Sequence, residues 1–254
     1  MEARRSPIEK ALKTLAYLIE ADQLQVGVRE LAKAIDVSPS RANKLLQELV
    51  DLGFVRQIPS SKKYALGVEF FRLSQLSFAK APMREFCLVG MRHMVQRINE
   101  TAYVAFFDQD RAEFVITASV ESDHNFRFMV PMNTWLPLGP TAEGVCILAQ
   151  FPAEQCADIV SRVSAVLQLD DVQVAAFWDA IRLAQQSDVA VSESPDGDGV
   201  RFAMPVMRSG RAIAAIIVIV PQMRFDQDKK QTIVTELAQC VHAVHQMLGS
   251  TDYY

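Results

Sequence analysis

The sequence lacks the short motifs of the common enzyme chemistries. It contains no Gly-x-Ser-x-Gly elbow, no Walker phosphate loop and no dinucleotide fingerprint, and Cys146 has no histidine near it in sequence that could act as its base. Only a catalytic constellation assembled from distant residues is left open, because such sites are recognised by geometry. We therefore expect no enzyme, no catalytic residue and no cofactor.

Cysteine and histidine are sparse, with four of each in 254 residues. The cysteines form no CxxC pair and have no histidine at zinc-finger spacing, so we expect four reduced core residues. These are Cys87, Cys146, Cys156 and Cys240. His242 and His245 could share a metal on one helix face but lack an evident third ligand. Asp196–Gly199 lacks the further oxygen ligands of a calcium loop. The sequence thus predicts no metal site, and a turn at 196–199.

Long apolar runs are also missing. The longest purely aliphatic stretch, Ala212 to Val220, stops at Pro221, well short of the roughly 20 residues that a membrane span needs. Residues 1–7 have no apolar run behind their arginines, unlike a secretory signal. We expect a cytoplasmic protein without a membrane partner.

The charge that is present is unevenly distributed. Residues 1–67 carry 11 Lys and Arg against 8 Asp and Glu, whereas the remainder carries 15 against 22. Half of the residues are apolar, and a chain of 254 residues can form two domains. A slightly basic N-terminal region followed by an acidic remainder indicates a module that faces nucleic acid, attached to a second domain.

Three helices are predicted in the first domain. Ser6–Glu9 has the capping-box pattern, and Ile8, Leu12, Leu15 and Ile19 then form one apolar stripe at helical spacing. A shorter stripe follows over residues 28–35. The third helix begins with Ser38 as cap and Pro39 at its first position, and it ends before Gly53.

Polar side chains gather on the face of the third helix opposite its apolar stripe. Arginine pairs with guanine and Asn or Gln with adenine, while Ser and Lys hold phosphate. After Gly53, residues 54–58 and 63–66 read as two strands around a basic tip, which is typical of a wing that contacts the DNA backbone. The predicted DNA-binding residues are Arg29, Ser38, Ser40, Arg41, Asn43, Lys44, Gln47, Lys62 and Lys63. Together these features predict a winged helix-turn-helix; the alternative is a three-helix protein-interaction module with a solvated polar face.

Four short segments in the right order carry a resemblance to a known family. They are Ile8–Leu12, Leu31-Ala32 followed by Val37–Ser40, Leu45–Leu49 with Gly53, and Tyr64–Gly67. On these segments the chain resembles the isocitrate lyase regulator (IclR) family of bacterial transcription factors. The resemblance implies a linker helix, a mixed α/β effector-binding domain with a GAF-like sheet, and dimers or tetramers on palindromic double-stranded operators that a small metabolite controls. The family usually has Thr at Arg41 and Arg at Lys44, so base preference stays open.

The rest of the chain is predicted to be α+β. We expect a winged helix-turn-helix domain over residues 1–67, a linker helix over 68–81 and an effector-binding domain over 82–254. The linker is rich in bulky apolar residues such as Phe71, Leu73 and Leu76, which favours a dimer interface over packing within one chain. Strands are expected at 102–107, 113–120, 127–132, 200–206 and 212–220. Helices are expected at 83–98, 141–150, 153–167, 171–186 and from Asp226.

Landmarks that border the effector pocket of the resembled family recur in this second domain, at Leu136–Leu138, Gly199–Arg201 and Ala214–Ile216. The resemblance implies Thr141, Ala142 and Glu143 at a helix start and Ser192 and Glu193 on a strand or loop. It further implies Phe202, Ile217 and Ile219 on the sheet. A wall could come from Met132, Thr134 and Trp135, although Trp135 could equally be core. Free amides at the helix start would suit a carboxylate.

The expected sheet positions are apolar, which predicts an aromatic or otherwise hydrophobic effector. Glu143, if ionised, would repel an anion, so a ligand with a hydroxyl, amide or amine donor is left open. The chain is thus expected to be a ligand-responsive, homo-oligomeric transcription regulator that acts as repressor or activator. The alternative is a small-molecule sensor or enzyme that uses the N-terminal module for protein contacts.

Overall fold

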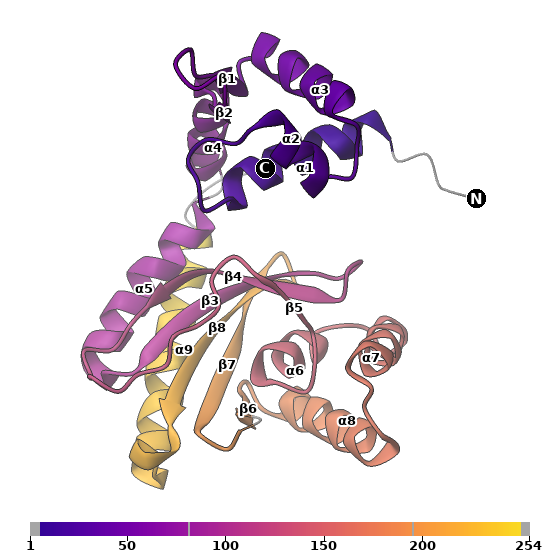
Figure 1. Cartoon of the computed structure of the whole chain (residues 1–254). Coiled ribbons are helices and arrows are strands. Elements are labelled where there is room, and N and C mark those ends of the chain that lie inside the picture. The colour runs from indigo at the N-terminus through magenta and orange to yellow at the C-terminus, as the bar shows by residue number, and fades with distance from the viewer. Residues whose placement is uncertain (1–5, 81, 195, 250–254) are drawn as a thin grey trace. The chain divides into compact units, whose positions relative to one another are not determined.

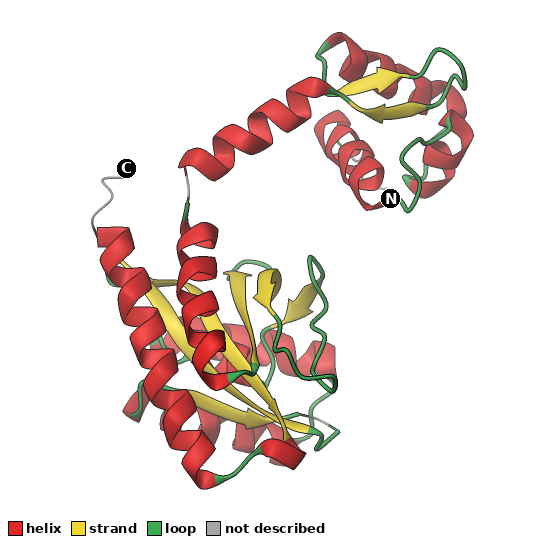
Figure 2. Ribbon diagram, turned by 90° about the vertical axis from the view of Figure 1, so that its left-hand side faces the viewer, coloured by secondary structure: helices red, strands yellow, loops and turns green. Residues whose placement is uncertain are grey.

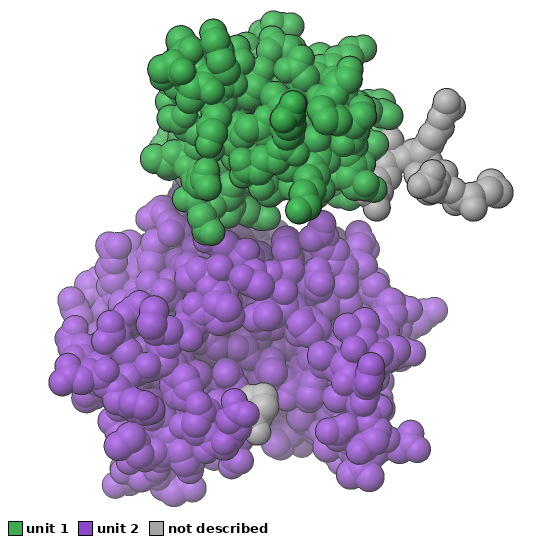
Figure 3. Space-filling view, viewed as in Figure 1, with its two compact units in different colours: residues 1–81 green, residues 82–254 purple. Residues whose placement is uncertain are grey.

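The computed structural model describes residues 6–80, 82–194 and 196–249. By its internal contacts the chain divides into two compact units, Met1–Ala81 and Pro82–Tyr254 (Figure 3). Residues 1–5, part of the segment in which the sequence predicts no secretory signal, lie outside the described residues. Among the helices described, none is both long and apolar enough to cross a membrane.

Unit 1 has the predicted winged helix-turn-helix order (Figure 1). Its elements are α1 (Pro7–Glu20), α2 (Val28–Ala34), α3 (Pro39–Asp51), β1 (Val55–Gln57), β2 (Tyr64–Leu66) and α4 (Val68–Lys80). The wing is an antiparallel pair in which Val55 lies opposite Leu66. Val26 adds a bridge to Tyr64 on the other side of β2. The wing is therefore tied to the segment before α2 as well as to its own hairpin.

The local signals in the sequence explain where these helices begin and end. Ser38 Oγ accepts a hydrogen bond from Arg41 N at 3.3 Å, which caps α3. Asp36 takes a left-handed φ of 53° in the turn between α2 and α3. Gly67 is required because a Cβ there would lie 2.1 Å from the carbonyl oxygen of Gly53. The wing can thus close against the end of α3 only through a glycine.

The apolar stripe predicted on α1 is only partly a core stripe. Leu18 is buried and Leu15 packs against the core of unit 1, whereas Ile8, Leu12 and Ile19 are 72%, 62% and 51% exposed. The predicted helix is present, but its buried face is the one that carries Thr14 and Leu18. The Thr14 hydroxyl donates to Lys10 O at 2.9 Å. A row of apolar side chains on α1 therefore faces outward.

Unit 2 is a mixed α/β domain. Its elements are α5 (Met83–Ile98), β3 (Thr101–Asp108), β4 (Glu113–Val120), β5 (Trp135–Pro137), α6 (Ala142–Leu148), α7 (Ala153–Leu167), α8 (Asp171–Gln186), β6 (Ala190–Glu193), β7 (Gly199–Arg208), β8 (Arg211–Pro221), the 3₁₀ turn η1 (Gln222–Arg224) and α9 (Gln227–Gly249). The six strands run β5-β4-β3-β8-β7-β6, with antiparallel neighbours throughout. The predicted fold class is confirmed.

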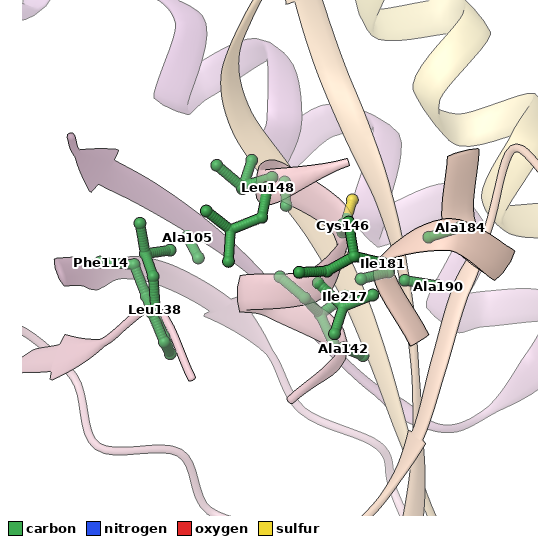
Figure 4. Packing of buried hydrophobic residues seen from close by; sticks show 14 of the residues in the cluster. Ala105, Phe114, Leu138, Ala142, Cys146, Leu148, Ile181, Ala184, Ala190 and Ile217 are labelled. Atoms are coloured by element: carbon green, nitrogen blue, oxygen red, sulfur yellow. The ribbon is translucent and has the colours of Figure 1, made fainter. Parts of the chain in front are cut away.

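The sheet of unit 2 separates two apolar cores. Helices α5 and α9 lie side by side over one face (Figure 2), where Ile216, Val218 and Leu237 are buried. Helices α6, α7 and α8 cover the other face (Figure 1). There Ile217 lies near Cys146 and Ala142 of α6 (Figure 4). Successive strand residues thus belong to different cores, as the pleat requires.

One predicted strand is wrong. Residues 127–132 form no strand; they belong to an irregular segment with a single bridge between Met132 and Ile116. The edge strand is instead the short β5, where Trp135 pairs with Val115. Phe128, from the irregular segment, packs against the core under α6, and a Cβ on Gly199 would lie 2.6 Å from its ring. The apolar alternation of this segment serves packing onto the sheet rather than strand pairing.

Candidate nucleic-acid interface and ligand site

The recognition helix α3 has one buried and one exposed face. Ala42, Leu45, Leu46 and Leu49 are buried in the core of unit 1. The side chains of the opposite face are exposed, and they are Ser40, Arg41, Asn43, Lys44 and Gln47. The structure therefore brings together the α3 residues that the sequence predicts for DNA contact.

Tyr64 of the wing organises two of these side chains. Its hydroxyl accepts from Gln47 Nε2 at 2.8 Å and donates to Asn43 Oδ1 at 3.4 Å. The Tyr64 ring is buried, and its backbone pairs with Val26 on one side and Gln57 on the other. The two amides are therefore held by a fixed element instead of rotating freely. Sequence reasoning missed Tyr64, because a buried wing tyrosine reads as core.

A second feature of α3 is a small groove against α1. It has a volume of about 150 Å³, and Lys10, Arg41 and Lys44 line it together with Pro7, Leu45 and Glu48. Lys44 Nζ also lies 4.0 Å from Glu48 Oε1, an exposed pair that stabilises the helix only weakly. Three cationic side chains at the edge of α3 suit a phosphate oxygen. Lys10 is thus a candidate contact that the sequence did not single out.

The remaining predicted DNA-binding residues lie on three different segments. Lys62 and Lys63 stand at the wing tip, with Lys62 at a left-handed φ of 56°. Arg29 is exposed in the first turn of α2, and Ser38 is engaged as the cap of α3. Wing and α2 can meet the DNA backbone beside the helix that reads bases, which is the usual division in this motif.

In unit 2, one face of the sheet carries polar side chains among apolar ones. Across the sheet Thr101, Ile219, Arg201 and Ser192 stand opposite one another on β3, β8, β7 and β6. Tyr103 occupies the next position of β3 on the same face, opposite Ile217. This face is the one that α6 covers. The arrangement places an arginine and a tyrosine beneath a helix start.

Glu143 of α6 joins the arginine and the tyrosine. The Tyr103 hydroxyl donates to Glu143 Oε1, and Arg201 Nε lies 3.7 Å from the same oxygen. Tyr103 and Glu143 are 1% and 5% exposed. Glu143 Oε2 and Arg201 Nη1 are buried without a hydrogen-bond partner in the structure. Unpaired buried polar atoms are uncommon in folded proteins, so these two atoms mark a candidate ligand site.

Tyr103, Glu143 and Arg201 together form the Glu143 cluster. Its surroundings favour the neutral forms of the Tyr103 hydroxyl and of the nearby Cys146 thiol. Burial and the neighbouring Glu143 carboxylate raise the pKa of Tyr103 well above its usual value, although Arg201 partly opposes them. Burial likewise raises the pKa of Cys146, one helical turn from Glu143, and the same carboxylate adds to the effect. Tyr103 is therefore a hydrogen-bond donor, and Cys146 is inert core.

The amides at the start of α6 are already engaged. Ala142 N donates to Ser192 Oγ at 2.8 Å, and Gly144 N donates to Thr141 Oγ1 at 3.5 Å. The expectation of free amides that suit a carboxylate is therefore wrong for these two amides, because Ser192 and the Thr141 cap satisfy them. Ser192 and Thr141 instead fix the position of Glu143.

Some residues predicted for the ligand site lie apart from this cluster. Phe202 is fully buried on the α5–α9 side of the sheet, and Glu193 is exposed beside Val200 on that side. Both predictions overlooked the alternation of a strand, which points neighbours to opposite faces. Trp135 is 42% exposed, with Arg111 4.9 Å from its ring centroid, and Met132 lies at the surface near Ile116. Ile217 and Ile219 do share the face of Arg201.

His242 and His245 have other partners than a metal. His245 Nε2 accepts from Met207 N at 2.8 Å, and His242 Nε2 lies 2.9 Å from Gln246 Nε2. Burial and the neighbouring His242 lower the pKa of His245, in keeping with a neutral acceptor ring. Among the described residues no group of three metal-ligating side chains occurs.

Comparison with known proteins covers both units. A model of the IclR helix-turn-helix domain matches residues 7–59, and a model of the bacterial transcriptional regulator IclR C-terminal domain matches residues 75–246. The HTH-type transcriptional regulator KdgR of Dickeya chrysanthemi is 25% identical over 260 residues, spanning 100% of this chain and 84% of its own length.

Solved structures resemble the fold over nearly the whole chain. An ICLR transcriptional regulator from Silicibacter sp. TM1040 has a TM-score of 0.76 at 22% identity, and 96% of each chain is covered. An IclR homolog from Microbacterium hydrocarbonoxydans, crystallised with 4-hydroxybenzoate, has a TM-score of 0.79 at 15% identity, with 97% of this chain and 100% of that chain covered. At these identities the solved structures show the fold alone.

Proposed function

The chain belongs to the IclR family of bacterial transcriptional regulators, and from this we propose that it binds a palindromic operator as a homo-oligomer under the control of a small metabolite. The matched relatives are transcription regulators rather than enzymes. A regulator acts where the chromosome lies, so we assign the chain to the cytoplasm.

One observation carries the DNA-binding assignment of individual residues. The face of α3 that is turned away from Leu45 and Leu49 is polar along its length and includes Arg41, Asn43 and Gln47. These side chains have the donor and acceptor groups that distinguish base pairs in the major groove. We assign base contacts to this face and backbone contacts to Lys62 and Lys63, as the wing tip is cationic.

Exposed apolar side chains support self-association through unit 1. Leu12 and Ile8 form an outward row on α1, and Phe71 of α4 is 55% exposed, with Leu73 and Leu76 exposed beside it. A soluble monomer rarely leaves so many large apolar side chains in water. We assign both surfaces to contacts with a second copy of the chain, which a two-fold symmetric operator also requires. Whether two such dimers form a tetramer is a matter for measurement.

The effector site that we propose is the Glu143 cluster of unit 2. It is built from buried, partly unpartnered polar groups, with Ile217 and Ile219 on the same face to contact a carbon skeleton. These isoleucines suit an effector with one apolar face, while Glu143 and Arg201 call for polar groups beside it. The alternative is an aromatic or otherwise hydrophobic effector. Phe202 gives it no support, since it faces the other core.

An effector can control the operator only by binding one arrangement of the chain better than another. If the coupling is within the usual range of about 1–3 kcal/mol, saturating effector changes operator affinity roughly 5- to 150-fold. By linkage the operator changes effector affinity by the same factor. This reciprocity distinguishes a regulator from a protein that merely binds both molecules.

A gel-shift titration against the DNA upstream of the gene tests the function. We expect a saturable band that resists excess nonspecific competitor DNA, and loss of that band when Arg41 and Asn43 are both replaced by alanine. The double variant should melt at the wild-type temperature, because both side chains are exposed. Absence of any competitor-resistant band with wild-type protein would favour a sensor that uses unit 1 for protein contacts.

A further inference from the structure

The effector class follows from the charge and the unpaired atoms of the Glu143 cluster. We propose that this site binds an uncharged compound with neighbouring hydroxyl groups, a polyol or a sugar, in preference to a carboxylate. The proposal deepens the proposed function, because it rests on unit 2 being the effector-binding unit.

Two buried atoms define what the ligand must supply. Glu143 Oε2 is an acceptor and Arg201 Nη1 is a donor, and neither has a partner. Each unpaired buried group is costly, so a ligand that pairs both is favoured over a ligand that pairs one. A hydroxyl group both donates and accepts, and two of them on neighbouring carbons can donate to Glu143 and accept from Arg201.

The pairing of the two side chains favours a ligand whose polar groups are close together. Arg201 Nε lies 3.7 Å from Glu143 Oε1, so the unpaired atoms belong to the two halves of one ion pair. A ligand whose polar groups stand at opposite ends of a ring can reach one of them at a time. Adjacent hydroxyls can reach both.

The charge of the cluster disfavours an anion. Arg201 is the ion-pair partner that the described residues provide for Glu143, and the Tyr103 hydroxyl is bonded to the same carboxylate and stays protonated. A bound carboxylate would place two negative charges beside one positive charge in a site with little water. An unbalanced buried charge costs several kcal/mol.

Two amides at the helix start above the site do not compensate for this cost. Ala142 N is engaged by Ser192 Oγ and Gly144 N by Thr141 Oγ1, so these amides are not available to a carboxylate. Ile219, which stands between Thr101 and Arg201 on the sheet, offers an apolar surface to the C–H face of a sugar. The surroundings thus fit a neutral ligand with one apolar face.

Matched pairs of neutral compounds and their acids provide the test. Full-length protein is titrated by calorimetry, without DNA, with glycerol and glycerate, D-xylose and D-xylonate, and D-glucose and D-gluconate, with 4-hydroxybenzoate as an aromatic acid. We expect saturable binding of at least one neutral compound, at least about 10-fold tighter than its acid, a difference of about 1.4 kcal/mol. Tighter binding of the acids or of 4-hydroxybenzoate, or no binding of any neutral compound, would overturn the proposal.

Variants show whether the Glu143 cluster sets this preference. Glu143→Gln keeps the side-chain shape and leaves the Arg201 charge uncompensated, so we expect the neutral-to-acid affinity ratio to fall at least about 10-fold. Glu193→Gln is the matched control, because this exposed carboxylate of β6 stands beside Val200 on the opposite face of the sheet, and it should leave the ratio unchanged. An unchanged ratio in Glu143→Gln would refute the assignment.

The outcome does not depend on Glu143→Gln folding. Arg201→Gln leaves the Glu143 charge uncompensated, and it should raise the neutral-to-acid ratio, the opposite direction to Glu143→Gln. The same ratio in both variants would contradict the charge argument. Because no DNA is present, binding of a sugar by a protein without operator binding would refute the regulatory function and leave this inference standing.

Discussion

The hydroxyl of Tyr64 in the wing accepts a hydrogen bond from Gln47 Nε2 of the recognition helix at 2.8 Å. Through the same hydroxyl Tyr64 donates to Asn43, so one buried residue fixes two amides that stand one turn apart on α3. Amide groups have interchangeable ends until a hydrogen-bond partner orients them. The wing therefore orients groups that can read adenine, besides the phosphate contacts that we propose for Lys62 and Lys63.

Replacing Tyr64 by phenylalanine should weaken operator binding about 2- to 10-fold, the equivalent of one net hydrogen bond. Discrimination among operators with single base changes should relax at the positions that Asn43 and Gln47 contact, while nonspecific binding stays the same. Fluorescence anisotropy with operator variants measures both. Tyr17→Phe, which removes a hydroxyl bonded to Glu30 Oε1 at 3.2 Å, is the control. If Tyr64→Phe discriminates among the operator variants as the wild type does, the hydroxyl has no role in base recognition.

Replacing Lys62 and Lys63 together by glutamine should reduce the salt dependence of operator binding. Each phosphate contact contributes about 0.9 to the slope of log affinity against log salt, so we expect the slope to fall by about 1 to 2. Base preference should not change, as the wing tip meets the backbone. Lys230→Gln, an exposed lysine of unit 2, is the control. A slope equal to that of wild type would exclude both lysines from the phosphate contacts.

Replacing Leu12 by glutamate should weaken self-association, because the side chain is 62% exposed in a row of apolar residues on α1. Sedimentation velocity should show a shift toward the monomer, and affinity for a palindrome should fall more than affinity for a half-site. Leu24→Glu is the control, because Leu24 is 93% exposed and lies outside the helices. If both variants sediment like the wild type, the row on α1 is no interface.

Glu100 provides a prediction about pH. Burial raises the pKa of this carboxyl group, but hydrogen bonds from Arg224 and Lys229 outweigh burial and hold the pKa below its usual value. A carboxyl whose pKa is lower in the folded state stabilises the protein above its unfolded pKa of about 4.3, and this contribution disappears as the pH falls through the folded value.

Glu100→Gln should therefore destabilise unit 2 by about 2–3 kcal/mol at pH 7, since it leaves two cations without their partner. The difference from wild type should shrink as the pH falls below the unfolded value of about 4.3 and through the lower folded value, where the wild-type carboxylate becomes protonated. Urea unfolding at several pH values gives both quantities. Glu121→Gln, an exposed partner of Arg127, should change little. A difference independent of pH would contradict the role of ionised Glu100.

Local signals in the sequence sufficed for most of the elements. Pro39 with Ser38 marks the start of α3, and apolar runs on either side of the turn Arg208–Gly210 mark β7 and β8, because these signals act within a few residues. The strand predicted at 127–132 is wrong, because the apolar residues of this segment pack onto the sheet without pairing with a neighbouring strand. Pairing partners are a property of the folded chain, and periodicity alone cannot reveal them.

The site was predicted less completely than the fold. Arg201 was noticed only as a neighbour of Gly199, although an arginine inside an otherwise apolar strand is itself a signal. Tyr103 gave none, because a tyrosine in a strand is common. Glu143 lies at a helix start, as the resemblance implies, whereas its pairing with Tyr103 and Arg201 depends on three segments meeting in space. Phe202 was misassigned by one position along β7, which is enough to reverse the face.

Neighbouring residues of β7 and β8 face different cores, so substitutions can be confined to one face of the sheet. Arg201 and Ala203 of β7 and Ile217 and Ile219 of β8, all odd-numbered, face α6, whereas Phe202, Ile216 and Val218 support α5 and α9. A combinatorial library confined to the odd positions can therefore redesign ligand selectivity while the packing that sustains the long helices is left as it is.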